Sequence, residues 1–209
     1  MPDPTLFVDQ CIAYRIDPGR SAQAVAGPLS PVPGQTTMST VRVGNDPRNL
    51  VGGTPWRFTF LKYWAGEVTT SALAGGVLTG PMSGCYLFRY THAGRPSVAH
   101  VGTDTTPDSA GTVRAKAVWR AMMARPGCVA NGEAPTKIVS TADQLRIAQQ
   151  NLNQLPQLCG YFEGGNAWAI LFVPAVAGVT LIPGVLRIAA VRRMPLLDWS
   201  AVAAMREWR

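Results

Sequence analysis

The stretch Cys85–His100, CYLFRYTHAGRPSVAH, decides our interpretation of the fold. Two runs of strand-forming residues flank the turn-like segment Thr91–Gly94, a pattern that predicts an antiparallel β-hairpin. A four-residue loop over Thr91–Gly94 places Cys85 directly opposite His100. A tighter turn centred on Ala93-Gly94 places Cys85 opposite Gly102 instead, and His100 becomes its diagonal neighbour. In both registers the imidazole stays close to the thiol.

This pairing predicts a nucleophilic site, because a thiolate attacks while a nearby imidazole removes and returns the proton. The chain has two histidines, and His92 falls in the predicted loop, so His100 is the candidate base. Residue types alone also allow a simpler interpretation. In that interpretation Cys85 is a buried small hydrophobic residue and His100 is structural.

Several residues around the hairpin are candidates for supporting roles. Gly84 allows the backbone to bend before the cysteine and, together with Ser83, is the candidate oxyanion and substrate-positioning segment. Thr79 is the candidate for orienting the imidazole as a third member. Thr103 and Asp104 compete with Thr79 for that role.

The composition predicts one folded, β-rich domain. The chain has 209 residues, of which 47% are hydrophobic and 15% charged, and its 21 glycines and 17 prolines indicate many turns. The net charge of +7 comes mainly from arginine, which favours contacts with carboxylates. An acidic protein partner and scattered surface charge both remain open. No basic run is interleaved with aromatic residues as a nucleic-acid groove requires.

The cysteine pattern does not predict a zinc site. The four cysteines show no CxxC spacing and have no histidine at metal-ligand spacing. A disulfide among Cys11, Cys128 and Cys159 stays open beside the simpler interpretation as small hydrophobic residues. The N-terminus lacks a classical signal peptide. The uncharged stretch 167–186 is interrupted by proline and glycine, so we expect two buried strands with a turn and no membrane span.

The predicted fold class is α+β, a single domain with a mostly antiparallel β-sandwich core flanked by helices. Residues 1–55 form a loop-rich segment, expected to belong to the same domain, and 56–209 form the catalytic part. A capping-box pattern, Thr141-Ala-Asp-Gln144, opens one of the helices. The helices are expected over 107–124, 141–152 and 199–208, and the strands over 56–63, 68–78, the hairpin, 158–162, 167–173, 179–182 and 186–191.

A short motif resembles a known family. Five residues separate Thr79 from Cys85, which ends the run Ser-Gly-Cys85, and His100 stands fifteen residues later in His-Val-Gly-Thr. This pattern resembles the catalytic domain of the cytotoxic necrotizing factor and dermonecrotic toxin family. It is also similar to the Burkholderia lethal factor and, more remotely, to the chemotaxis receptor glutamine deamidase. The resemblance spans residues 79–103 and implies a cysteine–histidine site on a β-sandwich flanked by helices.

The resemblance implies a role for each matched residue. Cys85 becomes the nucleophile, His100 the general base and acid, and Thr79 the orienting residue of a cofactor-independent deamidase that converts a glutamine of a host protein to glutamate. The host protein would be a target such as a small GTPase or a translation factor. The resemblance further implies a monomeric bacterial toxin or effector that is secreted by a non-classical route and acts in the host cytoplasm. A transglutaminase, a cysteine protease and a non-enzymatic arginine-rich binding module are the alternatives.

Overall fold

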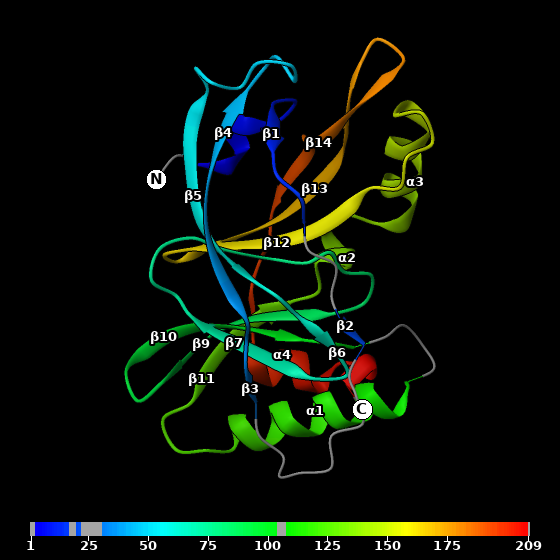
Figure 1. The fold of residues 1–209 in the computed structure, drawn as a ribbon. Coiled ribbons are helices and arrows are strands. Elements are labelled where there is room, and N and C mark those ends of the chain that lie inside the picture. The colour runs from blue at the N-terminus through cyan, green and yellow to red at the C-terminus, as the bar shows by residue number, and fades with distance from the viewer. Residues whose placement is uncertain (1–2, 17–19, 22–30, 104–107, 209) are drawn as a thin grey trace.

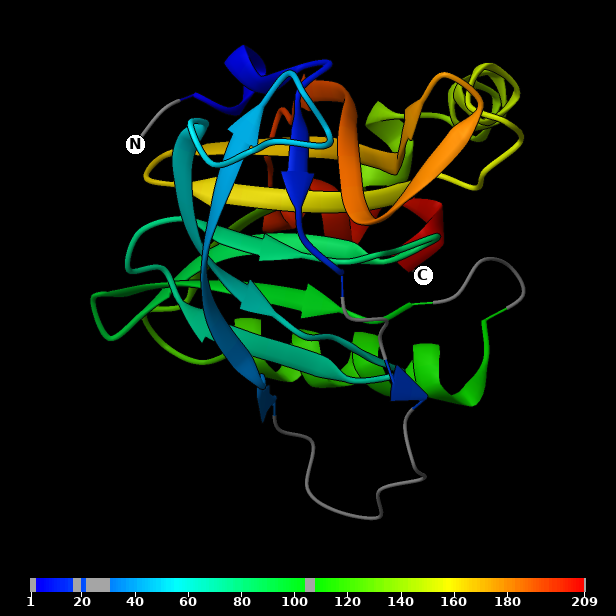
Figure 2. The same ribbon diagram turned by 45° about the horizontal axis from the view of Figure 1, so that its top comes forward.

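One half of the molecule is a closed β-barrel (Figures 1 and 2). The computed structural model describes residues 3–16, 20–21, 31–103 and 108–208. Within these ranges seven strands close the barrel in the order β1-β14-β13-β12-β8-β5-β4. Their bounds are β1 Cys11–Ala13, β4 Thr36–Gly44, β5 Thr54–Leu61, β8 Val77–Thr79, β12 Gln157–Glu163, β13 Asn166–Ala177 and β14 Thr180–Arg193.

The barrel replaces the sandwich that the sequence predicts, and that part of the prediction is wrong. The short strand β1 pairs with β14 on one side and with β4 on the other, which closes the sheet. The long strands β13 and β14 carry register shifts at Leu171/Phe172 and Pro174/Val176. Such bulges increase local bend and twist, which lets a sheet curl onto itself. The described part of the 1–55 segment supplies β1 and β4 to this barrel.

A second sheet lies beneath the barrel and contains the predicted hairpin. Its order is β15-β11-β9-β10-β7-β3, and β2 pairs separately with β6 in a parallel two-stranded sheet. The bounds are β2 Arg20–Ser21, β3 Val32–Pro33, β6 Trp64–Ala65, β7 Val68–Ala72, β9 Tyr86–His92, β10 Arg95–Val101, β11 Val129–Glu133 and β15 Leu197–Asp198. Figure 2 shows the sheet sandwiched between the barrel and the helix α1.

Helices cover the sheet face that points away from the barrel. α1 (Ala110–Met123) and α4 (Trp199–Ala204) pack there, whereas α2 (Pro135–Ile138) and α3 (Thr141–Gln150) lie on the barrel side (Figure 1). Short 3-10 turns occupy Pro4–Phe7 and Arg206–Trp208. The N-cap of α3 is Ser140, whose hydroxyl accepts a hydrogen bond from the Asp143 N–H, so the predicted cap at Thr141 is one residue late.

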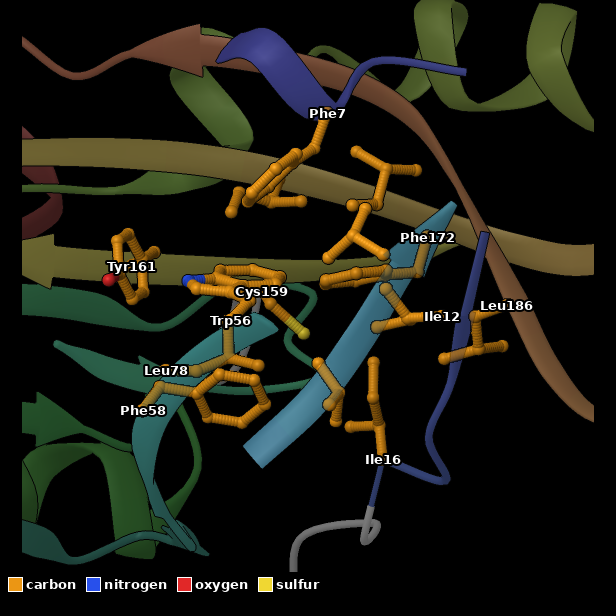
Figure 3. Close-up of a cluster of buried hydrophobic side chains, with 14 of the residues drawn as sticks. Phe7, Ile12, Ile16, Trp56, Phe58, Leu78, Cys159, Tyr161, Phe172 and Leu186 are labelled. Atoms are coloured by element: carbon orange, nitrogen blue, oxygen red, sulfur yellow. The ribbon is translucent and has the colours of Figure 1, made fainter. Parts of the chain in front are cut away.

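Three buried clusters follow from this layering. The barrel core fills the barrel interior and includes Trp56, Cys159 and Tyr161 (Figure 3). The interlayer core lies between the barrel and the sheet, and the helix-side core lies between the sheet and α1. Side chains alternate between the two faces of a strand, so the hairpin contributes to both the interlayer core and the helix-side core. Leu87 faces the barrel, and Phe88 faces the helices.

The uncharged stretch 167–186 forms most of β13 and the start of β14, in agreement with the expectation of strands. The two strands predicted over 179–182 and 186–191 are one continuous strand, which passes through Gly184 at φ 73°. In the part of the chain that the structure describes, no helix has the length and apolar character needed to span a membrane.

Candidate active site

The hairpin adopts the tighter of the two predicted registers. Arg95 pairs with His92, and His100 pairs with Leu87, so the direct pairing of Cys85 with His100 is wrong. The turn residues Ala93 and Gly94 both have positive φ, 49° and 74°. A two-residue turn with positive φ at both positions matches the twist of paired strands, which explains why it forms in place of the four-residue loop.

Cys85 and His100 nevertheless share one face of the sheet. Cys85 lies two residues before Leu87, the partner of His100, and all three side chains point toward the barrel. Diagonal neighbours of this kind are about 7–8 Å apart. Both side chains are deeply buried, with 5% of Cys85 and 0% of His100 exposed.

Thr79 reaches His100 from the barrel. In β8 the side chain of Leu78 enters the barrel core while Val77 faces the sheet, and alternation directs Thr79 the same way as Val77. The Thr79 hydroxyl lies 2.7 Å from His100 Nδ1, within hydrogen-bonding distance. The structure therefore joins the predicted orienting residue to the predicted base, across two different sheets.

Two further residues are neighbours of His100, one stacked on its ring and one paired with it along the sheet, and sequence reasoning missed both. The ring of Tyr63 stacks on His100 with a centroid separation of 4.5 Å and an interplanar angle of 8°. Thr69 of β7 pairs with His100 on the side away from Leu87 and is also buried. No short sequence motif marks either residue. Tyr63 follows the barrel strand β5, and Thr69 lies on a strand whose pairing partner cannot be read from the neighbouring residues.

The surroundings keep His100 neutral at physiological pH. Burial lowers its pKa from 6.5 to about 3, since a charged imidazolium is poorly solvated there. When Nδ1 carries the proton and donates it to the Thr79 hydroxyl, the lone pair resides on Nε2. Nε2 is buried and has no hydrogen-bond partner among the described residues. In this tautomer Nε2 is the ring nitrogen that could accept a proton, although burial disfavours the charged form.

A hydrogen bond between Thr103 and Gly84 links the chain after β10 to the chain before β9, next to the Cys85 thiol. The Cys85 Sγ lies 3.6 Å from the Thr103 carbonyl oxygen, and the Thr103 hydroxyl donates to the Gly84 carbonyl at 2.6 Å. Thr103 therefore supports the cysteine, and Thr79 takes the position against the imidazole. The other competing residue, Asp104, lies outside the described residues, and Ser83 is exposed beside Gly84.

A pocket of about 220 Å³, with several charged side chains in its lining, opens near Gly84 and Thr103. Gly84 and Tyr86, the neighbours of Cys85 along the chain, contribute to its wall together with Thr103. Two lysines and two carboxylates complete the polar lining: Lys116, Lys137, Asp108 and Glu207. The Tyr86 side chain points to the helix side of the sheet, whereas that of Cys85 points to the barrel side.

The cysteines show no arrangement for a metal or a disulfide. Cys11, Cys85, Cys128 and Cys159 are all described, and no disulfide links them. Within the described ranges, no three side chains of His, Cys, Asp or Glu gather as a metal site requires. Burial raises the pKa of the Cys11 and Cys159 thiols, which keeps both protonated and unreactive.

Comparison with known proteins adds no relative to this picture. Neither a family model, nor a curated protein, nor a solved structure matches the chain.

Proposed function

We propose that this protein is a cysteine-dependent deamidase that converts a glutamine side chain of a host target protein to glutamate. The observation that carries the proposal is the 2.7 Å contact between Thr79 and His100, which orients a neutral imidazole on the same sheet face as Cys85. The motif over residues 79–103, with its resemblance to deamidating toxins, supplies the substrate class. A secreted toxin or effector role in the host cytoplasm is part of the same proposal.

The proposed reaction uses these three residues in order. The Cys85 thiol gives its proton to His100 Nε2 as Sγ attacks the carboxamide carbon of the glutamine. The imidazolium then protonates the departing nitrogen, which leaves as ammonia, and a thioester to Cys85 remains. His100 next takes a proton from water, whose oxygen attacks the thioester carbon. The proton returns to Sγ, and glutamate is released.

Burial shapes how this proton transfer occurs. A separated thiolate and imidazolium are both unfavourable in an apolar environment. We therefore expect the proton to move as Sγ attacks, without a stable ion pair beforehand. Thr79 stabilises the imidazolium in this step, because its hydroxyl oxygen accepts the Nδ1 hydrogen in both protonation states. The long, unbranched glutamine side chain suits a nucleophile that lies below the surface.

The test compares the wild-type protein with Cys85→Ser and with Cys128→Ser, which removes a half-buried thiol elsewhere. Each protein is incubated with host-cell lysate. Ammonia release is measured, and glutamine peptides are examined for the mass increase of an amide-to-acid conversion. We expect conversion with the wild type and with Cys128→Ser, and none with Cys85→Ser. Equal conversion by all three proteins would contradict the proposal.

The same incubation separates the alternatives. Incorporation of an added primary amine in place of hydrolysis identifies a transglutaminase, and cleavage of a peptide bond identifies a protease. A non-enzymatic binding module would keep its partner and its cellular effect after Cys85→Ser. Each of these results would replace deamidation as the function.

A further inference from the structure

An apolar pocket of about 680 Å³ opens at one end of the barrel core. This volume lies within the range of roughly 300–1,000 Å³ that is usual for small-molecule sites. Cys85, His100 and Thr79 do not belong to the described lining, so the pocket is separate from the candidate active site. Most of that lining is apolar and includes Ile16, Pro81, Pro174, Leu181, Ile182 and Pro183.

Strand pairing shows that several lining side chains point toward the barrel interior. Gln157 pairs with Phe172, and Pro174, two residues further along β13, pairs with Leu186. Phe172 and Leu186 belong to the barrel core, and residues directly opposite each other point to the same face of a sheet. Gln157 and Pro174 therefore point inward as well. Figure 3 shows Ile16 and Leu186 at the same side of this core, so the pocket is a recess that continues the barrel interior.

Gln157 supplies an amide within this apolar lining. Its side-chain oxygen is buried and has no hydrogen-bond partner among the described residues. The NH₂ group is the other end of the amide and can donate to a ligand in the pocket. The one charged residue of the described lining, Arg15, is exposed, whereas its neighbours Tyr14 and Ile16 pack in or against the barrel core. The inward part of the pocket is therefore neutral, with one hydrogen-bonding group.

We propose that this pocket binds a neutral, largely apolar small molecule that carries a hydrogen-bond acceptor, such as a ketone or ester oxygen. The apolar walls remove the ligand surface from water, and the Gln157 NH₂ donates to the acceptor and fixes its orientation. The mouths of β-barrels are among the preferred places for such sites. A charged ligand would lose its hydration without meeting an opposite charge in the recess, which disfavours it. The proposal does not depend on deamidation.

A matched pair of probes tests the proposal on the full-length protein. Acetophenone carries a carbonyl oxygen on an apolar frame, and ethylbenzene has nearly the same shape without the acceptor. Binding is followed by NMR at the backbone amides of Gln157, Gly184 and Val185, which line the pocket. We expect saturable shifts at these amides with both probes, because the apolar walls accept either frame.

Replacing the amide makes the test specific. Gln157→Leu removes the donor with little change in side-chain size. We expect it to weaken acetophenone binding roughly 3–10-fold, the effect of one hydrogen bond, and not to weaken ethylbenzene binding. Retained ethylbenzene binding shows that the pocket is intact, and Gln157→Met is a second apolar replacement for the case that Gln157→Leu does not fold. Gln149→Leu, at an exposed position of α3, is the control and should leave both affinities unchanged.

Three results would overturn the proposal. Absence of saturable shifts at the pocket amides with either probe excludes a small-molecule site. Equal affinity of the wild type and Gln157→Leu for acetophenone excludes the Gln157 amide as the donor. Shifts of the same amides on dilution of the protein, without a response to either probe, assign the pocket to a second copy of the chain. These results are independent of ammonia release, which tests the proposed function separately.

Discussion

The barrel core and the interlayer core each bury a cysteine, yet they place it in opposite chemical surroundings. Cys159 lies in the barrel among side chains such as Trp56 and Phe172, and burial raises the pKa of its thiol (Figure 3). Cys85 lies in the interlayer core, on the same sheet face as His100. The comparison teaches that burial raises the pKa of a thiol, so the proposed reactivity of Cys85 would depend on the histidine that shares its sheet face.

The largest expected difference concerns activity. Cys85→Ala should lower deamidation by at least ~10³-fold, because no other group replaces the nucleophile. Cys159→Ala should leave activity intact and instead lower the free energy of unfolding by about 1–2 kcal/mol, through lost packing in the barrel core. Steady-state ammonia release and urea denaturation measure the two effects. Loss of activity in Cys159→Ala with an unchanged fold would contradict the assignment of Cys159 to a packing role.

Acid should weaken the interlayer core through His100. Its folded pKa of about 3 lies below the ordinary value of 6.5, so the unfolded chain binds the proton more readily. The stabilisation from the neutral imidazole is complete above pH 6.5 and is lost as the pH falls toward 3, by up to about 5 kcal/mol. Denaturation curves at stepped pH should show this slope.

The second histidine supplies the control. His92 is exposed at the hairpin turn, so His92→Gln should keep the acid-dependent slope. His100→Gln should flatten that slope, although it also lowers stability at every pH by removing the partner of Thr79. An unchanged slope in His100→Gln would show that other groups cause the acid sensitivity.

Packing between the layers gives a smaller effect. Gly160 of β12 faces the sheet, and an added Cβ would lie 2.0 Å from Leu87 Cδ1. Gly160→Ala should therefore lower the free energy of unfolding by roughly 1–3 kcal/mol. Gly52→Ala is the control, because its added Cβ meets no atom within 4 Å. Combining Gly160→Ala with Leu87→Val should recover part of the loss, and failure to do so would place the strain elsewhere.

The smallest expected effect concerns the orientation of the base. Thr79→Val keeps the shape of the side chain but removes the hydroxyl that contacts His100 Nδ1. We expect kcat to fall about tenfold with little change in KM, the loss of one hydrogen bond in the reacting state. Thr79→Ser should restore kcat. A Thr79→Val protein with wild-type kcat would exclude an orienting role.

Local patterns in the sequence predicted the local structure. The hairpin, the helix at 141–150 and the strands at 157–163 depend on neighbouring residues, such as the turn at Ala93-Gly94. The Ser140 cap differs by one residue, but the single strand predicted over 68–78 is wrong, because this segment forms two strands, β7 and β8, which belong to different sheets. The turn and the cap depend on the φ angles and hydrogen bonds of single residues, and the residue types alone allow more than one choice at each.

Long-range structure was beyond the same reasoning. Barrel closure depends on β1 bridging β4 and β14, which lie far apart in the sequence. Tyr63 reaches His100 because the barrel and the sheet pack together, whereas Thr69 lies beside His100 through strand pairing within the sheet. Thr79 was an exception, since the motif resemblance singled it out and the structure then placed it against the imidazole.

The contact between Thr79 and His100 also has a consequence for the stage of folding at which the proposed base can act. One residue belongs to the barrel and the other to the sheet, so the base is oriented only when both layers have formed and docked. A nascent, partly unfolded or cleaved chain would carry every reactive residue and still lack an oriented base. The proposed activity would then require complete tertiary assembly and would be absent from either layer alone.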